Sequence, residues 1–122
     1  MGKRRQEKMA VEVKRVISYI IQGGMKDPRI DAKTVSVTRV EVSSDISHAK
    51  VNISVLGDEI KQEETMKALK NAKGYLRSEV AKALKIKHAP ELELRIDRSI
   101  EHGIKISSLL EELKENKEIN HE

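Results

Sequence analysis

The stretch MKALKNAKGYLRSEVAKAL, residues 66–84, decides the fold because it carries one apolar stripe past a glycine. The apolar residues recur at helical spacings on both sides of Gly74; they are Met66, Leu69, Leu76, Val80 and Leu84. A glycine inside a helix costs about 1 kcal/mol relative to alanine, which disfavours one smooth helix here. We therefore predict two helices joined by a kink at Ala72-Lys73-Gly74.

Two β-strands are predicted before this helix pair and one after it. Thr34–Val42 is rich in β-branched residues, and Ala49–Val55 and Leu92–Ile96 alternate apolar with polar residues. The connection Ser43–His48 is short enough for a hairpin between the first two strands. In the first strand, Val35 and Val37 have the opposite parity from Val40 and Val42, so we predict a bulge near Thr38-Arg39.

Helices are also predicted at both ends of the chain. Lys3–Gln22 has apolar residues at helical spacing, and Ser99 is a candidate cap for a last helix. The buried side of that last helix is predicted to consist of Ile106, Leu109, Leu110 and Leu113. The resulting order, α-β-β-α-α-β-α, indicates a single small α+β domain over residues 1–113, with helices on one face of the sheet, and a short polar tail at 114–122.

The composition excludes several classes of function. The chain has 122 residues and no cysteine, so it has no disulfide, Cys-ligated zinc or thiol nucleophile. It has no glycine-rich phosphate-binding motif, and we expect no catalytic residue, no metal and no cofactor. Two tyrosines are too few for a surface that stacks several bases. No apolar run is long enough to span a membrane, and we expect a cytoplasmic monomer.

Positive charge is concentrated in two segments. Residues 1–15 carry a net charge of +4 and residues 61–90 carry +5, whereas residues 91–122 carry −4. Such an uneven distribution of charge favours binding to a polyanion, although solvent-exposed helices are also commonly rich in lysine. We predict an RNA-binding face around the kink and the start of the first helix, formed by Arg4, Arg5, Lys8, Lys67, Lys70, Lys73, Gly74, Arg77 and Lys82.

Gly74 and Tyr75 are the two special residues of this predicted face. Without a Cβ at Gly74, a phosphate could approach the backbone N–H groups at the start of the second helix. The alternative is a glycine that only lets two helices wrap the core. For Tyr75 we weigh stacking on a base against inward packing of the ring, and expect inward packing.

Five segments in this order resemble the ribosome-binding factor A family. They are Lys26-Asp27-Pro28-Arg29-Ile30; Val40–Ser43 with Asp45 and Ala49-Lys50-Val51; Ala72-Lys73-Gly74-Tyr75-Leu76-Arg77; Pro90-Glu91-Leu92; and Asp97-x-Ser99 with Gly103, Ile106 and Leu109-Leu110. The resemblance covers the chain from about Arg4 to Leu113. One departure is Leu94, which stands where the family often has an aromatic residue.

The resemblance implies a type II KH-like fold in which an Ala-x-Gly kink, here Ala72 and Gly74, replaces the usual GXXG loop. It implies a bacterial cytoplasmic assembly factor that binds the free small (30S) ribosomal subunit. Members of the family support late maturation and processing of the 5′ end of 16S rRNA, and matter most for growth in the cold. Ribosomal proteins and an assembly GTPase are further partners to consider.

Two other functions stay open from the sequence. One is a protein-interaction module, in which an acidic last helix docks a ribosomal protein or an assembly GTPase and RNA contact is incidental. The other is a metal-dependent nuclease at Asp97, Glu101 and His102, although neighbouring residues on a helix point to different faces.

Overall fold

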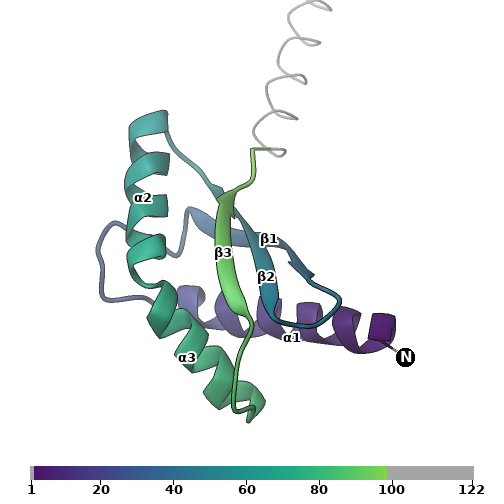
Figure 1. The fold of residues 1–122 in the computed structure, drawn as a ribbon. Helices are drawn as coiled ribbons and strands as arrows, with labels where there is room; N and C mark the ends of the chain where they lie inside the picture. Colours follow the sequence, from purple (N-terminus) through teal and green to yellow (C-terminus); the bar gives the residue numbers. More distant parts are fainter. Residues whose placement is uncertain (1, 99–122) are drawn as a thin grey trace, which may run out of the picture.

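The computed structural model describes residues 2–98, which form three helices and one three-stranded sheet (Figure 1). In chain order these elements are α1 (Gly2–Gln22), β1 (Val35–Val42), β2 (His48–Val55), α2 (Glu59–Asn71), α3 (Lys73–Leu84) and β3 (Glu91–Ile96). The three predicted strands and the first helix are confirmed to within one residue, and the predicted helix pair is confirmed as α2 and α3. The predicted last helix, with Glu101 and His102, and the domain boundary at Leu113 lie outside the described residues.

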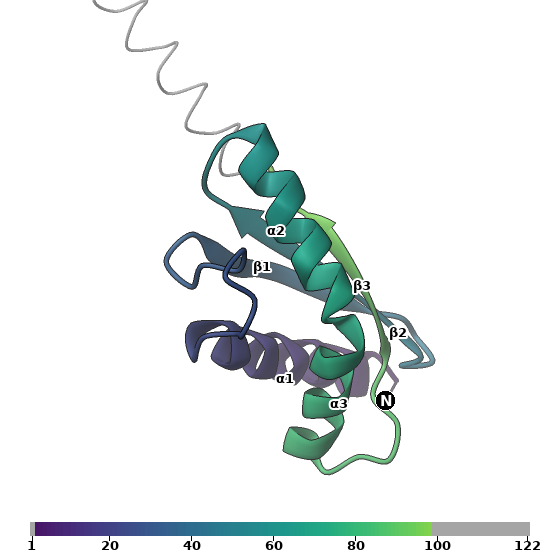
Figure 2. The same cartoon turned by 90° about the vertical axis from the view of Figure 1, so that its left-hand side faces the viewer.

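The strand order is β1-β2-β3, and β3 runs parallel to β2. A parallel neighbour requires a crossover, which α2 and α3 provide. The helix α1 packs on β1, whereas α2 and α3 contact β3 (Figures 1 and 2). None of the helices within residues 2–98 is long and apolar enough to cross a membrane.

The core lies between the helices and one face of the sheet. In β3 and the first half of β2, buried and exposed residues alternate, whereas the last three residues of β2 are all buried. Val51 and Ile53 of the sheet are fully buried. The helices contribute the fully buried Ile17, Leu69 and Leu76 to the same hydrophobic cluster. The predicted covering of one sheet face is confirmed.

The predicted bulge in β1 is present between Val37 and Arg39. It places Val37 opposite Ile53 and Val40 opposite Val51, so both parities of the strand reach the core. Thr38 at the bulge donates its hydroxyl to the Asp97 carboxylate at 2.6 Å. The Asp97 carboxylate is therefore hydrogen-bonded to β1. Within residues 2–98, no group of three or more His, Asp or Glu side chains is arranged to hold a metal ion.

The turn between β1 and β2 is organised by Asp45. Its Oδ1 atom accepts hydrogen bonds from the Ser47 hydroxyl at 2.6 Å, the Ser43 hydroxyl at 2.8 Å and the Ser47 N–H at 3.1 Å. These bonds lower the pKa of Asp45 from 3.8 to about 2. The carboxylate thus fixes the hairpin that sets the register of the two strands.

Candidate nucleic-acid interface

The predicted kink is confirmed, and it is centred on Ala72. Ala72 has φ −90° and ψ 6°, and it is both the last cap of α2 and the first cap of α3. Its N–H bonds to the carbonyls of Ala68 and Leu69, both at 3.1 Å, and its carbonyl accepts from Leu76 N–H at 2.9 Å. The chain therefore changes direction at one residue while its hydrogen bonds continue (Figure 2).

Gly74 is the second residue of α3, and the fold does not require a glycine there. Among the described glycines only Gly24 and Gly57 have positive φ. A Cβ built on Gly74 would meet no atom within 4 Å. The open space in front of this backbone is consequently available to a partner.

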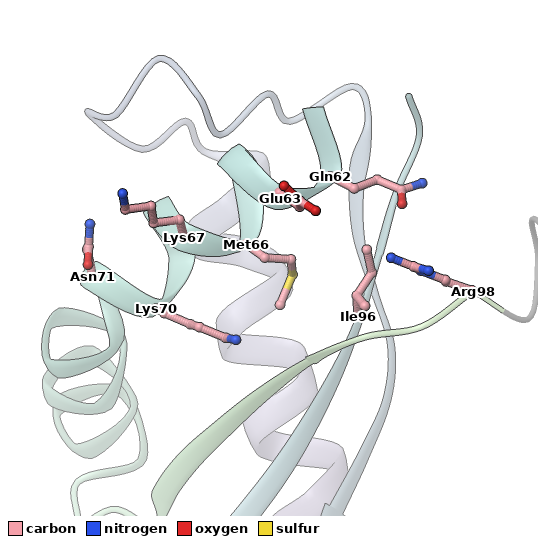
Figure 3. A pocket seen from close by; sticks show the side chains of 8 residues that line it. All are labelled: Gln62, Glu63, Met66, Lys67, Lys70, Asn71, Ile96 and Arg98. Carbon is pink, nitrogen blue, oxygen red and sulfur yellow. The ribbon is translucent and has the colours of Figure 1, made fainter. Parts of the chain in front are cut away.

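Two of the predicted cations, Lys67 and Lys70, line a cavity of about 450 Å³ between α2 and β3. Figure 3 shows Met66, Ile96, Lys70 and Arg98 directed into this space, whereas Lys67 points outward. Of the lining residues within 2–98, Glu63 alone is acidic, against three cations. We call this cavity the basic groove; its floor is apolar and its rim attracts anions.

Lys73 and Arg77 lie on α3 beyond the kink, both in exposed positions. Arg77 has a structural role, because its Nε–H donates to the carbonyl of Ala89 at 3.1 Å and ties α3 to the segment before β3. Lys82 lies about two and a half turns from the kink and approaches Glu79 at 3.6 Å. Lys73, the first residue of α3, is therefore the α3 cation nearest to the kink.

The structure does not bring the cations of α1 to the kink. Arg4, Arg5 and Lys8 are exposed near the start of α1, where Gln6 donates to the carbonyl of Val42 at the end of β1. The other end of α1, at Gln22, leads into the loop beside the kink. Fourteen to eighteen residues separate the two places, or roughly 20–27 Å along the helix axis. The predicted single face is thus two separate basic regions.

Tyr75 differs from the expectation of inward packing. Tyr75 is 55% exposed, and the neighbouring Leu76 is fully buried. With 3.6 residues per turn, successive side chains point about 100° apart, and in this turn Leu76 faces the core while Tyr75 faces outward. Tyr75 is therefore available for contact from outside.

The loop after α1 is fastened beside the kink by Asp27, Arg29 and Thr65. Arg29 donates to the Asp27 carboxylate from Nη2 at 2.7 Å, and its backbone N–H donates at 3.0 Å. The buried Thr65 of α2 donates its hydroxyl to the carbonyl of Arg29 at 3.0 Å. The hydrogen bonds from the Arg29 side chain and backbone lower the pKa of Asp27 from 3.8 to about 2.

Replacing Asp27 with asparagine is expected to remove a pH-dependent part of the stability. Because the pKa of Asp27 is lower in the folded chain, its ionised form stabilises the protein above pH 3.8, and this contribution disappears as the pH falls through about 2. Thermal denaturation of the two proteins should show a difference in Tm that is full near neutral pH and vanishes toward pH 2. A difference that stays constant over this range would contradict the role of the ionised carboxylate.

Arg98, in the basic groove, and Lys26, beside the kink, are cations that the sequence does not indicate as RNA contacts. Arg98 follows β3 and reaches the basic groove only because β3 lies beside α2. Lys26 lies in the loop after α1, on the other side of the kink. The position of Arg98 depends on strand order and that of Lys26 on loop packing. Neither can be predicted from a local sequence pattern.

Comparison with known proteins identifies the family. The family model for Ribosome-binding factor A matches residues 5–110. Ribosome-binding factor A from Syntrophomonas wolfei is 67% identical over 115 residues, which is 94% of this chain and 94% of that protein. The crystal structure of ribosome-binding factor A from Thermus thermophilus matches with a TM-score of 0.66 and 26% identity, covering 77% of this chain and 97% of that one.

A third match is a Thermus thermophilus ribosome binding factor A homology model fitted into the cryo-EM map of a 30S–RbfA complex. It has a TM-score of 0.59 and 26% identity, and it covers 73% of this chain and 91% of that one. The solved structures share the KH-like fold, which confirms the predicted fold class. Both the sequence and the fold therefore show that this chain belongs to the ribosome-binding factor A family.

Proposed function

We propose that this protein binds the free small ribosomal subunit in the cytoplasm and supports late maturation of 16S rRNA, including processing of its 5′ end. Its membership in the family supports this proposal, as does the Thermus relative fitted into a 30S complex. The protein makes and breaks no bond in this role. It binds folded RNA and holds a junction in an immature arrangement until other factors complete it.

The observation that carries the proposal is a set of cations along the basic groove and at the kink. Lys70 points into the groove from α2 and Lys67 points outward beside it (Figure 3). Arg98 reaches the groove from the end of β3, and Lys73 follows the kink. Cations that neutralise phosphates release condensed counterions, which provides affinity without reading sequence. The exposed backbone at Gly74 offers an additional approach for a phosphate.

The second basic region, at Arg4, Arg5 and Lys8, contributes shape selectivity in this proposal. Its distance from the kink means that a short single strand does not easily satisfy both regions. A folded RNA whose two phosphate backbones are spaced like the two basic regions can contact both regions at once. Recognition by shape and phosphates is typical of proteins that bind structured RNA.

Sedimentation of a lysate with the tagged protein tests the proposal. The protein is expected to travel with free small subunits and to be absent from complete ribosomes. With purified subunits, its affinity should fall steeply as salt rises, because phosphate contacts dominate. A weak salt dependence would favour the alternative, in which the protein docks on a ribosomal protein or an assembly GTPase.

Changing Gly74 to alanine is expected to separate binding from stability. Because the added Cβ meets no atom and φ is not positive, stability should stay equal or rise by up to about 1 kcal/mol. The same methyl group would block a phosphate from the backbone, and loss of one charge-assisted hydrogen bond predicts roughly tenfold weaker binding to the small subunit. Filter binding and thermal denaturation measure the two effects.

Ser78→Ala is the matched control for this variant. Ser78 is exposed in the next turn of α3, and its change also favours the helix without blocking the kink. Binding should stay at the wild-type level. If Gly74→Ala binds as tightly as Ser78→Ala, no phosphate approaches this backbone.

A further inference from the structure

A second cavity lies on the opposite side of the kink from the basic groove. It has a volume of about 550 Å³ and is formed between the loop after α1 and the junction of α2 and α3. Its lining consists of Gly24, Met25, Lys26, Asp27, Ala68, Asn71, Ala72 and Tyr75. The volume lies within the range of sites that take a small organic group.

The walls of this cavity suit a flat aromatic ring. Ala68 and Ala72 are small, so α2 presents a nearly bare surface at its end. The exposed Tyr75 and the half-buried Met25 also line the cavity. Among the described residues, the Tyr75 hydroxyl has no hydrogen-bond partner that would hold the ring elsewhere.

The polar groups of the cavity suit the edge of a nucleobase. Asn71 lines both cavities, and its side chain points away from Ile96 and Arg98 in Figure 3. An amide offers donors and an acceptor, which match the mixed edge of a base. Asp27 is paired with Arg29 at 2.7 Å, so its negative charge is largely offset, while Lys26 adds a cation at the rim.

We propose that this cavity receives one unstacked nucleobase of the RNA whose phosphates lie on the basic groove. This inference rests on the proposed function. A helix is about 10–12 Å across, so a strand that crosses the kink places a nearby base beside Tyr75 within a few nucleotides. The surrounding cations favour an RNA occupant over an apolar protein side chain, because Lys26 and Lys73 flank the cavity and the kink.

Tryptophan fluorescence can test the occupant directly, because the chain contains no tryptophan. The Tyr75→Trp variant is titrated with purified free small subunits. Stacking on a base should quench its emission. Leu56→Trp is the matched control, since Leu56 is 52% exposed after β2 and lines neither this cavity nor the basic groove, so its emission should not change.

Two further variants give the effect on affinity. Tyr75→Leu keeps an apolar side chain but removes the ring, and binding is expected to weaken by about 5- to 100-fold. Tyr75→Phe keeps the ring and should bind within about twofold of the wild type. A helix surface position tolerates both changes, so the melting temperature should stay nearly constant.

Each remaining outcome contradicts the inference in a recognisable way. Unquenched emission from the Tyr75→Trp variant, together with normal binding by Tyr75→Leu, shows that no base enters the cavity. A blue shift without quenching shows that an apolar protein group enters it instead. If either result occurs while charge reversal at Lys67, Lys70 and Lys73 still abolishes binding, the proposed function stands and only this inference fails.

Discussion

Changing Lys67, Lys70 and Lys73 together to glutamate is expected to weaken binding to the free small subunit by about 100-fold or more. Each substitution removes a cation that would contact a phosphate and places a repelling carboxylate there. A lost charge-assisted contact costs about 1.5–3 kcal/mol, and 1.4 kcal/mol corresponds to a factor of ten. The slope of log affinity against log salt should also become shallower by about 2 to 3.

Stability should barely change in this variant, because all three side chains are exposed and none makes an ion pair within residues 2–98. We expect a Tm within about 4 °C of the wild type. Arg77 is left unchanged on purpose, since its bond to the Ala89 carbonyl would confound the result. Binding to subunits is measured by filter retention or light scattering at several salt concentrations.

Charge reversal at Lys33, Lys85 and Lys87 is the matched control. These lysines are also exposed, and their change to glutamate alters the net charge equally. Lys85 and Lys87 follow α3, about 18 Å along the helix from the kink. The control should lose far less affinity. Equal losses in both variants would mean that binding depends only on overall charge.

Replacing Leu76 with alanine is expected to produce the largest loss of stability, about 2–5 kcal/mol. Leu76 is fully buried and is the first core residue after the kink, so it anchors α3 beneath the sheet. Its truncation leaves a cavity that the surrounding side chains fill only in part. The Tm should fall by roughly 10–30 °C in a thermal scan.

Leu56→Ala is the control for this prediction. Leu56 is 52% exposed after β2, so the same chemical change should cost less than about 1 kcal/mol. If Leu76→Ala is no more destabilising than Leu56→Ala, the junction of α2 and α3 is not held by the core. The position of the cations on both sides of the kink would then lack its structural basis.

Local pattern was sufficient to predict most of the fold. The parity change in β1 predicted the bulge, since only an extra residue returns Val40 and Val42 to the face of Val35 and Val37. The stripe past Gly74 predicted two helices, and the break is at Ala72, two residues earlier. In both cases the signal lies within a few residues of the feature.

Properties that depend on distant contacts could not be predicted in this way. The strand order places Arg98 in the basic groove. The sequence around Arg98 does not predict which strand or helix lies next to β3. Arg77 was predicted as an RNA contact, but its bond to Ala89 depends on how the segment before β3 folds back. The separation of Arg4, Arg5 and Lys8 from the kink similarly follows from how α1 crosses the sheet.

The central claim is that the cations at the kink contact 16S rRNA in the complex with the small subunit. A photoreactive amino acid at position 67, compared with the same group at position 85, tests this contact most directly. Position 67 points outward from α2 beside the groove (Figure 3). Position 85 is the residue that caps the far end of α3. We expect crosslinks to 16S rRNA from position 67 and few from position 85. Crosslinks from position 67 to ribosomal proteins alone, or RNA crosslinks mainly from position 85, would contradict the account.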